Sequence, residues 1–310
     1  MTVAERSTMT RLTTLPPRAV LVHRRTEFTE LLERHSTRGQ AAFFLQTRGR
    51  QLTDVESRHR RVMAAVAAVA AAVPDDWRHG RVERAEVPRF SFEPGDIVVV
   101  VGQDGLVANV AKYLDGQLVI GIDPEPDRNP GVLVRHSPAE AGALLRAAAS
   151  LAGPGVDALS MVQADTDDGQ RLLALNEIFV GHASHQTARY SLSAPGGTAE
   201  LQASSGVIIG TGTGATGWCR SAWLERHSAL TLPVPAEPRL TWFVREAWPS
   251  ATTGTHRTEG QLAAGQSLTL SVMSDQLVLF GDGMESDAVG LSSGQVATVS
   301  LASRTLSLVR

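Results

Sequence analysis

Residues 96–102 read DIVVVVG, and this run constrains the fold of the chain more than any other stretch of the sequence. A strand with five consecutive apolar residues, here 97–101, has to be covered on both faces, which is typical of a parallel sheet packed between helices. Its neighbours agree, because residues 18–24 and 118–123 are also strand-like, while residues 26–36 show a helical pattern with Thr26 as a plausible N-cap. The pattern predicts βαβ units.

Further segments extend this prediction over the first half of the chain. Residues 53–73 form a long helical stretch, and residues 137–152 form another, with Ser137 as N-cap and Pro138 at the first helical position. The apolar run AAFFLQ at 41–46 is interpreted as a strand. We therefore expect an α/β domain with a parallel, Rossmann-like sheet over residues 18–152. The polar segment 1–17 before it is expected to be disordered.

The pattern changes after residues 152–157. Short segments of alternating polarity follow one another, separated by Gly, Ser, Asp and Pro, which is typical of an antiparallel sandwich or barrel. Only residues 214–228 look helical in this half. The sequence thus predicts a β-rich sandwich domain over residues 157–310.

Composition excludes several classes of function. The net charge of −3 gives no electrostatic footprint for nucleic acid. Cys219 is the only cysteine, so neither an internal disulfide nor a cysteine-based metal cluster can form, and a cytoplasmic location is predicted. The apolar stretch 62–73 is too short to span a bilayer, so no membrane partner is expected.

Three stretches could carry chemistry. In GQDGL (102–106), a buried strand stops at a Gly and Asp104 follows near a helix start. Backbone N–H groups at a helix N-terminus bind phosphate, ligands gather at the carboxyl ends of parallel strands, and a carboxylate there could accept a proton from a hydroxyl. An ordinary turn with an acid near the helix start explains the same residues. Both interpretations stay open on this stretch alone.

In the other two stretches, polar residues follow or interrupt an apolar strand. In LALNEIFVG (173–181), Asn176 and Glu177 break an apolar run, so they are either buried side chains that need partners or a solvated strand end. In SSGVIIGTGTGATGW (204–218), a strand enters a loop whose density of Thr and Gly suits the polar edges of a nucleotide. A later Asp-Gly pair, in LVLFGDGMESD (277–287), is interpreted as a hairpin turn.

Together these motifs resemble those of the NAD kinase family. GQDGL, LNE (175–177), SGVIIGTGTGATGW (205–218) and GDGME (281–285) stand in the family's order and spacing, and the resemblance covers roughly residues 18–308. It implies an ATP-dependent phosphotransferase that phosphorylates the adenosine ribose 2′-hydroxyl of NAD. It also implies Mg²⁺, held by the nucleotide phosphates without a protein metal site, and a homodimer or homotetramer.

Carried over by position, the resemblance makes Asp104 the general base. It assigns the donor phosphates to Gly102, Gln103 and Gly105. It assigns the acceptor to Asn176, Glu177, Ser205, Thr211, Thr213, Gly214, Thr216 and Trp218.

The departures from the family concern mainly the acceptor. Gln103 replaces a Gly, Leu106 replaces a Thr, and Ser205 stands where the family has an Asp that contacts the acceptor. The acceptor is therefore left as NAD or a related nucleotide, nucleoside or sugar. The alternative hypothesis is a non-catalytic nucleotide-binding or regulatory protein with the same fold. An oxidoreductase is disfavoured, because no GxGxxG follows an early strand.

Two arginines and two histidines are interpreted as surface residues without a role in the site. Arg189 and Arg245 could meet phosphates, but a surface ion pair is the favoured role for each. His182 and His185 are interpreted as solvated loop residues, because no third metal ligand accompanies them.

Overall fold

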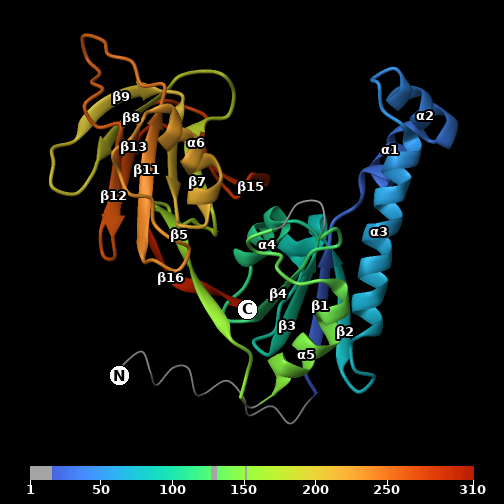
Figure 1. Cartoon of the computed structure of the whole chain (residues 1–310). Helices are drawn as coiled ribbons and strands as arrows, with labels where there is room; N and C mark the ends of the chain where they lie inside the picture. Colours follow the sequence, from blue (N-terminus) through green and yellow to red (C-terminus); the bar gives the residue numbers. More distant parts are fainter. Residues whose placement is uncertain (1–15, 127–130, 151) are drawn as a thin grey trace. The chain divides into compact units, whose positions relative to one another are not determined.

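The computed structural model describes residues 16–126, 131–150 and 152–310 (Figure 1). Two compact units make up the chain: Met1–Val156 together with Ser307–Arg310, and Asp157–Leu306. All but the last two residues of the expected disordered segment 1–17 lie outside the described residues. The last four residues, which the sequence pattern assigns to the β-rich domain, belong to the first unit, because Ser307 and Leu308 pair with Leu118 and Val119.

The first unit is built on a parallel sheet with the strand order β2-β1-β3-β4. All six residues of β3 are buried, as its apolar run predicts. The strands of this sheet are β1 (Arg18–His23), β2 (Arg78–Glu83), β3 (Asp96–Val101) and β4 (Leu118–Ile122). The helices of the unit are α1 (Glu27–His35), α2 (Arg38–Gln46), α3 (Leu52–Ala71), α4 (Asp104–Ala111) and α5 (Ala141–Ala149), with 3₁₀ turns at Arg84–Arg89 and Pro138–Glu140.

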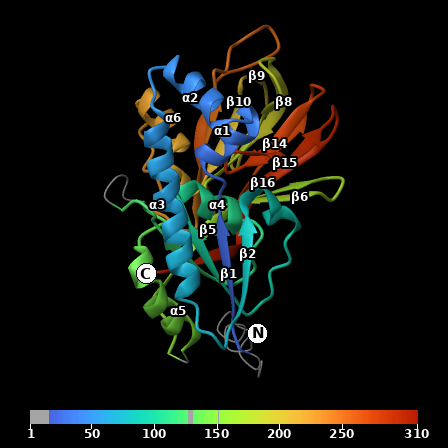
Figure 2. The same cartoon turned by 90° about the vertical axis from the view of Figure 1, so that its right-hand side faces the viewer.

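The core of the first unit forms between this sheet and two of its helices. Apolar residues of α3 and α5 pack on Ile97, Val99 and Ile120, which share one face of the sheet. Figure 2 shows α3 running alongside β1. No described helix is long and apolar enough to cross a membrane.

For the first unit, one prediction was wrong and one strand was missed. Residues 41–46 lie in helix α2, not in a strand, because Thr37 caps the helix through the Gln40 amide and the run buries only one face, with Phe43 69% exposed. Strand β2 was not predicted at all. Its sequence, RHGRVE, has no apolar run, because β2 lies at the edge of the sheet and buries little.

The second unit is a sandwich of antiparallel strands, as predicted. One layer is a six-stranded sheet with the order β12-β11-β10-β7-β14-β15, and its inner face packs on β8, β13 and β16 of the other layer. The strands are β5 (Val156–Thr166), β6 (Arg171–Ala174), β7 (Glu177–His182), β8 (Ala188–Ser193), β9 (Glu200–Ser204), β10 (Gly206–Gly210), β11 (Arg239–Arg245), β12 (Glu259–Ala263), β13 (Ser267–Val272), β14 (Leu277–Gly281), β15 (Met284–Leu291) and β16 (Val296–Val309).

Helix α6 (Trp218–Glu225) covers the outer face of the six-stranded sheet, where it packs on Phe179, Ile208 and Phe243. A 3₁₀ turn, η4 (Gly214–Thr216), precedes it. Strand alternation places Glu177 on the same outer face as Phe179.

Candidate functional site

The motif GQDGL forms the junction between β3 and α4. Strand β3 ends at Val101, and Asp104 is the first residue of the helix. Gln103 is exposed and extended, with φ −102° and ψ 165°. Any residue adopts that conformation, so the backbone does not require a glycine at position 103.

Close packing surrounds Gly102, whereas the space beside Gly105 is open. Leu106 is buried and lies against Gly102, where a Cβ would come within 2.9 Å of the Leu106 Cδ2 atom. The apolar side chain that replaces the family's Thr is therefore part of the core. A Cβ at Gly105, by contrast, would meet nothing within 4 Å, so the fold leaves the space beside Gly105 open.

Asp104 is held by backbone amides. Its Oδ1 atom accepts hydrogen bonds from the amides of Leu133 (2.9 Å) and Val134 (3.0 Å), and its Oδ2 atom accepts one from Val132 (2.8 Å). A Cβ at Gly131 would lie 2.5 Å from Oδ1, so the loop needs a glycine there. A carboxylate has about four lone-pair sites, which leaves one on Oδ2 for a further donor.

The motif LNE marks a break between two strands. Strand β6 ends at Ala174 and β7 begins at Glu177, so the apolar run is not one strand. The carboxylate of Asp282 accepts hydrogen bonds from the amides of Leu175 (2.9 Å) and Asn176 (2.7 Å), and the Asp282 amide donates to the Glu177 carbonyl (3.1 Å). This buried acid thus fixes the backbone of the break.

Asp282 lies in a two-residue hairpin turn with Gly283, which confirms that this Asp-Gly pair forms a turn, as the sequence predicts. Gly281 pairs with Met284 across β14 and β15, and both turn residues have positive φ, 55° at Asp282 and 65° at Gly283. That geometry is favoured by the twist of antiparallel hairpins.

The Thr/Gly loop packs directly against this break. The Thr211 amide donates to the Asn176 carbonyl (2.9 Å), and the Thr211 hydroxyl donates to the Leu175 carbonyl (2.6 Å). Gly214 lies so close that a Cβ there would collide with the Asn176 carbonyl group and come within 3.2 Å of a Glu177 carboxyl oxygen. The fold therefore brings together Asn176, Glu177, Thr211 and Gly214.

Several polar groups at this point have no partner in the protein. Within the described residues, the side-chain carboxamide of Asn176 and the carboxyl group of Glu177 make no hydrogen bond. The buried hydroxyl of Thr213 has no partner there either. Buried polar groups normally pair. These groups have the chemistry needed to bind the hydroxyls and ring nitrogens of a polar ligand.

Burial raises the pKa of Glu177 to about 8, and the negative charge of Asp282 adds to this shift. At neutral pH the Glu177 carboxyl is therefore mostly protonated, and it can donate one hydrogen bond as well as accept others.

This shift predicts how stability depends on pH. In the unfolded chain Glu177 ionises near its ordinary pKa of 4.5, whereas in the folded chain it keeps its proton up to a pH of about 8. The folded state binds more protons between these values, so the free energy of unfolding is expected to fall as pH rises, by at most about 1.4 kcal/mol per pH unit. Denaturant unfolding from pH 5 to pH 8 measures the slope. Glu177→Gln should flatten it, and an unchanged slope in that variant would rule out the assignment.

The other residues that the sequence predicts at the acceptor lie in the same unit. Thr216 is exposed and its hydroxyl donates to the Thr213 carbonyl (2.8 Å). Trp218 stacks on Phe179, with ring centroids 5.5 Å apart. Ser205 is half-buried and its amide donates to the Arg245 carbonyl (2.9 Å).

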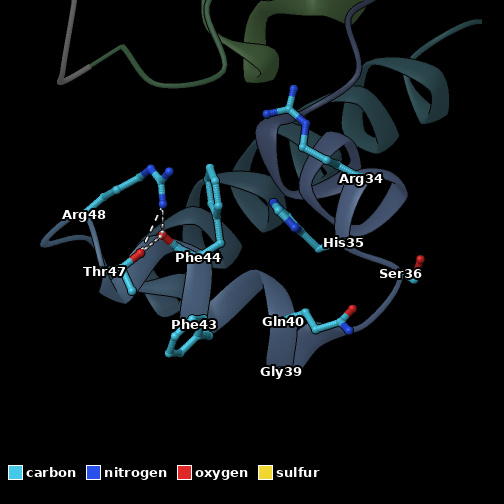
Figure 3. Close-up of a pocket in the computed structure, with 9 residues that line it drawn as sticks. All are labelled: Arg34, His35, Ser36, Gly39, Gln40, Phe43, Phe44, Thr47 and Arg48. Atoms are coloured by element: carbon cyan, nitrogen blue, oxygen red, sulfur yellow. Dashed lines mark hydrogen bonds between the residues drawn. The ribbon is translucent and has the colours of Figure 1, made fainter.

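A separate hollow of about 560 Å³ lies on the hairpin of α1 and α2 (Figure 3). Its main cation is already engaged, since the Arg48 guanidinium lies 3.8 Å from the Phe44 ring centre and donates to the Phe44 carbonyl. The hollow contains none of the predicted site residues. In the part of the chain that the structure describes, no three His, Cys, Asp or Glu side chains converge to hold a metal ion.

No protein-family model matches the chain, and no curated protein matches it in sequence. A solved structure does match: an NAD kinase from Archaeoglobus fulgidus in complex with ATP, with a TM-score of 0.56 and 17% sequence identity, over 94% of this chain and 93% of that one. The two chains share a fold. It consists of an α/β domain followed by a domain of antiparallel strands, which confirms the predicted fold class.

Three features of the candidate site were not predicted from the sequence. Asp282 was interpreted only as a turn residue, although it holds the amides of the LNE break. The bonds from the loop at 132–134 to Asp104 had no sequence signal. Arg245 was interpreted as part of a surface ion pair; it does contact Glu246 at 3.5 Å, but it also lies over the Trp218 ring.

Proposed function

We propose that this chain is an ATP-dependent small-molecule kinase. It transfers the γ-phosphoryl group to a hydroxyl of NAD or of a related nucleotide, nucleoside or sugar. The observation that carries this proposal is the convergence of Asn176 and Glu177 with the loop at 211–214, which backbone contacts hold together. Within the described residues, the side chains of Asn176 and Glu177 and the Thr213 hydroxyl make no hydrogen bond there. The fold shared with an NAD kinase supports it.

In this proposal Asp104 is the general base. Three amides orient its carboxylate, and the remaining lone pair of Oδ2 accepts the proton of the attacking hydroxyl. Phosphoryl transfer depends mostly on positioning and electrostatics, so a base fixed by three bonds suits the reaction. Gly102, Gln103 and Gly105 line the donor phosphates, and the open space beside Gly105 permits a close approach.

The acceptor is bound by the second unit in this proposal. The Asn176 amide and the protonated Glu177 carboxyl pair with the polar edges of the acceptor, and Thr211, Thr213, Gly214 and Thr216 form the loop beside it. Magnesium enters with ATP in this proposal, since Mg²⁺ in phosphoryl-transfer sites is bound largely through the phosphates of the substrate. A homodimer or homotetramer belongs to the same proposal, and sedimentation of the purified chain tests it.

The test is a screen for phosphorylated products. Purified protein is incubated with ATP and Mg²⁺ and with NAD, NADH, nucleosides or a metabolite extract, and products are identified by mass. We expect one acceptor to gain a single phosphoryl group. ATP consumption without any product that gains this mass contradicts the proposal.

The second candidate is a non-catalytic nucleotide-binding protein. One observation favours it: the Asp104 carboxylate is already engaged by three amides, so it serves as an anchor for the loop at 132–134 even without catalysis. Tight binding of a nucleotide in calorimetry, with no change in the mass of any acceptor, decides for this function.

A further inference from the structure

We propose that Ser160 is a positioning residue for the candidate acceptor site, and that it acts through a backbone turn at residues 234–237. The turn holds the Thr/Gly loop at 211–214 against the LNE break. This inference rests on the proposed function, because that proposal assigns the acceptor to the loop. Ser160, the turn, the loop and the break all belong to the second unit.

The Thr/Gly loop touches the turn at Gly212. This glycine is buried, and a Cβ there would collide with the Val234 carbonyl group and come within 2.6 Å of the Pro235 nitrogen. Only a residue without a Cβ lets the two backbones approach so closely. The turn therefore limits how far the loop can move on this side.

The LNE break limits the loop at its next glycine. Gly214 lies so close to the Asn176 carbonyl group that a Cβ would collide there as well. Thr213 stands between the two glycines, and its buried hydroxyl has no hydrogen-bond partner within the described residues. No bond of its own fixes this hydroxyl, so its position depends on the turn and the break that hold the neighbouring glycines.

The sequence VPAE gives the turn a fixed shape. The Glu237 amide donates to the Val234 carbonyl (2.9 Å), which closes a four-residue turn, and proline is favoured at the second position of such turns. The Glu237 carboxylate also accepts a hydrogen bond from the Val234 amide (3.2 Å). Because these bonds lie within the turn, they fix its shape but not its place in the unit.

Ser160 fixes that place from strand β5. Its amide donates to the Pro235 carbonyl (3.0 Å), and its hydroxyl donates to the Glu237 carbonyl (2.9 Å). Ser160 and Glu237 are 77 residues apart in the chain, so these bonds tie the turn to a distant strand. The Ser160 side chain is buried, with 4% exposed, so it acts through the turn and not on the ligand itself.

The test is Ser160→Ala in the full chain, with Ser274→Ala as the matched control. The Ser274 hydroxyl accepts a hydrogen bond from the Arg189 amide (2.8 Å), so the control also removes one bond between a hydroxyl and the backbone of the second unit. Hydrogen exchange at amides 211–217, without ligand, measures how firmly the loop is held. We expect faster exchange there in Ser160→Ala and native exchange in the control.

Kinetics separate a positioning role from a purely structural one. With the acceptor that the product screen identifies, Ser160→Ala should raise the acceptor KM roughly 2–10-fold, as expected for one lost hydrogen bond, while kcat stays within about twofold of native. The KM for ATP should not change, because the residues proposed to bind the donor belong to the first unit. Calorimetric titration with NAD measures the corresponding loss of affinity without turnover.

The other outcomes overturn the inference or separate it from the kinase proposal. Native exchange at 211–217 in Ser160→Ala would show that Ser160 does not hold the loop. Faster exchange with an unchanged acceptor KM and no change in NAD binding, including the case in which the native chain uses no acceptor and binds no NAD, would make Ser160 a structural residue only. If Ser160→Ala weakens NAD binding although no acceptor is ever phosphorylated, the inference holds and the kinase proposal fails.

Discussion

Replacing Asp104 with Asn is expected to lower turnover by a factor of roughly 10²–10⁴, because the variant cannot accept the proton of the attacking hydroxyl. The structure adds a second consequence. An amide nitrogen at the Oδ2 position would face the Val132 N–H, so two donors would meet where the native chain has a 2.8 Å hydrogen bond. We expect a modest loss of stability as well, about 1–3 kcal/mol. Steady-state kinetics and denaturant unfolding measure the two effects separately.

A matched variant separates catalysis from loop anchoring. Asp123 follows β4 and is buried, and its Oδ1 atom accepts a hydrogen bond from the Glu125 amide (2.8 Å). Asp123→Asn removes the charge of a buried carboxylate but can keep its amide oxygen on this one backbone amide, so it should cost less stability than Asp104→Asn, and turnover should stay within a few-fold of native. If Asp104→Asn also retained turnover within tenfold, Asp104 would be an anchor and the non-catalytic function would gain support.

Replacing Gly214 with Ala is expected to destabilise the second unit by about 3 kcal/mol and to raise the acceptor KM by more than tenfold. A Cβ at this position would lie 2.7 Å from the Asn176 carbonyl carbon and closer still to its oxygen. That carbonyl also accepts the Thr211 amide, so neither side can move without breaking the contact between loop and strand. Denaturant unfolding measures the first effect, and kinetics at saturating ATP measure the second.

The control for this variant is Gly290→Ala in β15. A Cβ there would meet nothing within 4 Å, so the same change of residue should cost little and leave the KM unchanged. Native-like stability of Gly214→Ala would mean that the Thr/Gly loop can withdraw from Asn176. The site would then be held less firmly than its contacts indicate.

The sequence-based interpretation of Gln103 changes with the structure. In the sequence, Gln103 was one of the departures from the family motif that left the identity of the acceptor open. Its extended backbone and exposed side chain fit the turn without strain, and Leu106 departs from the motif because its side chain fills the core beside Gly102. Neither departure therefore removes the geometry of the loop, and the identity of the donor remains part of the proposal.

The errors in the sequence-based prediction have a common physical cause. Residues 41–46 are apolar enough for a buried strand, but they lie in a helix that buries only one face, with Ala41 and Leu45, against α1 and α3. Strand β2 is polar, yet its backbone pairs with β1 along its whole length. Local polarity reports burial well, but it does not distinguish a strand from a short helix or reveal an edge strand.

Local patterns in the sequence by themselves determined the two-part fold class, the buried strand β3, the helix start at Thr26 and the hairpin turn at Asp282, because burial, capping and turns depend on neighbouring residues. Only the tertiary structure decided the chemistry of the site. The raised pKa of Glu177 comes from its burial and from Asp282, more than 100 residues away in the chain, since 282 − 177 = 105. Electrostatic and hydrogen-bond energies depend on distance through space, which the order of residues does not state.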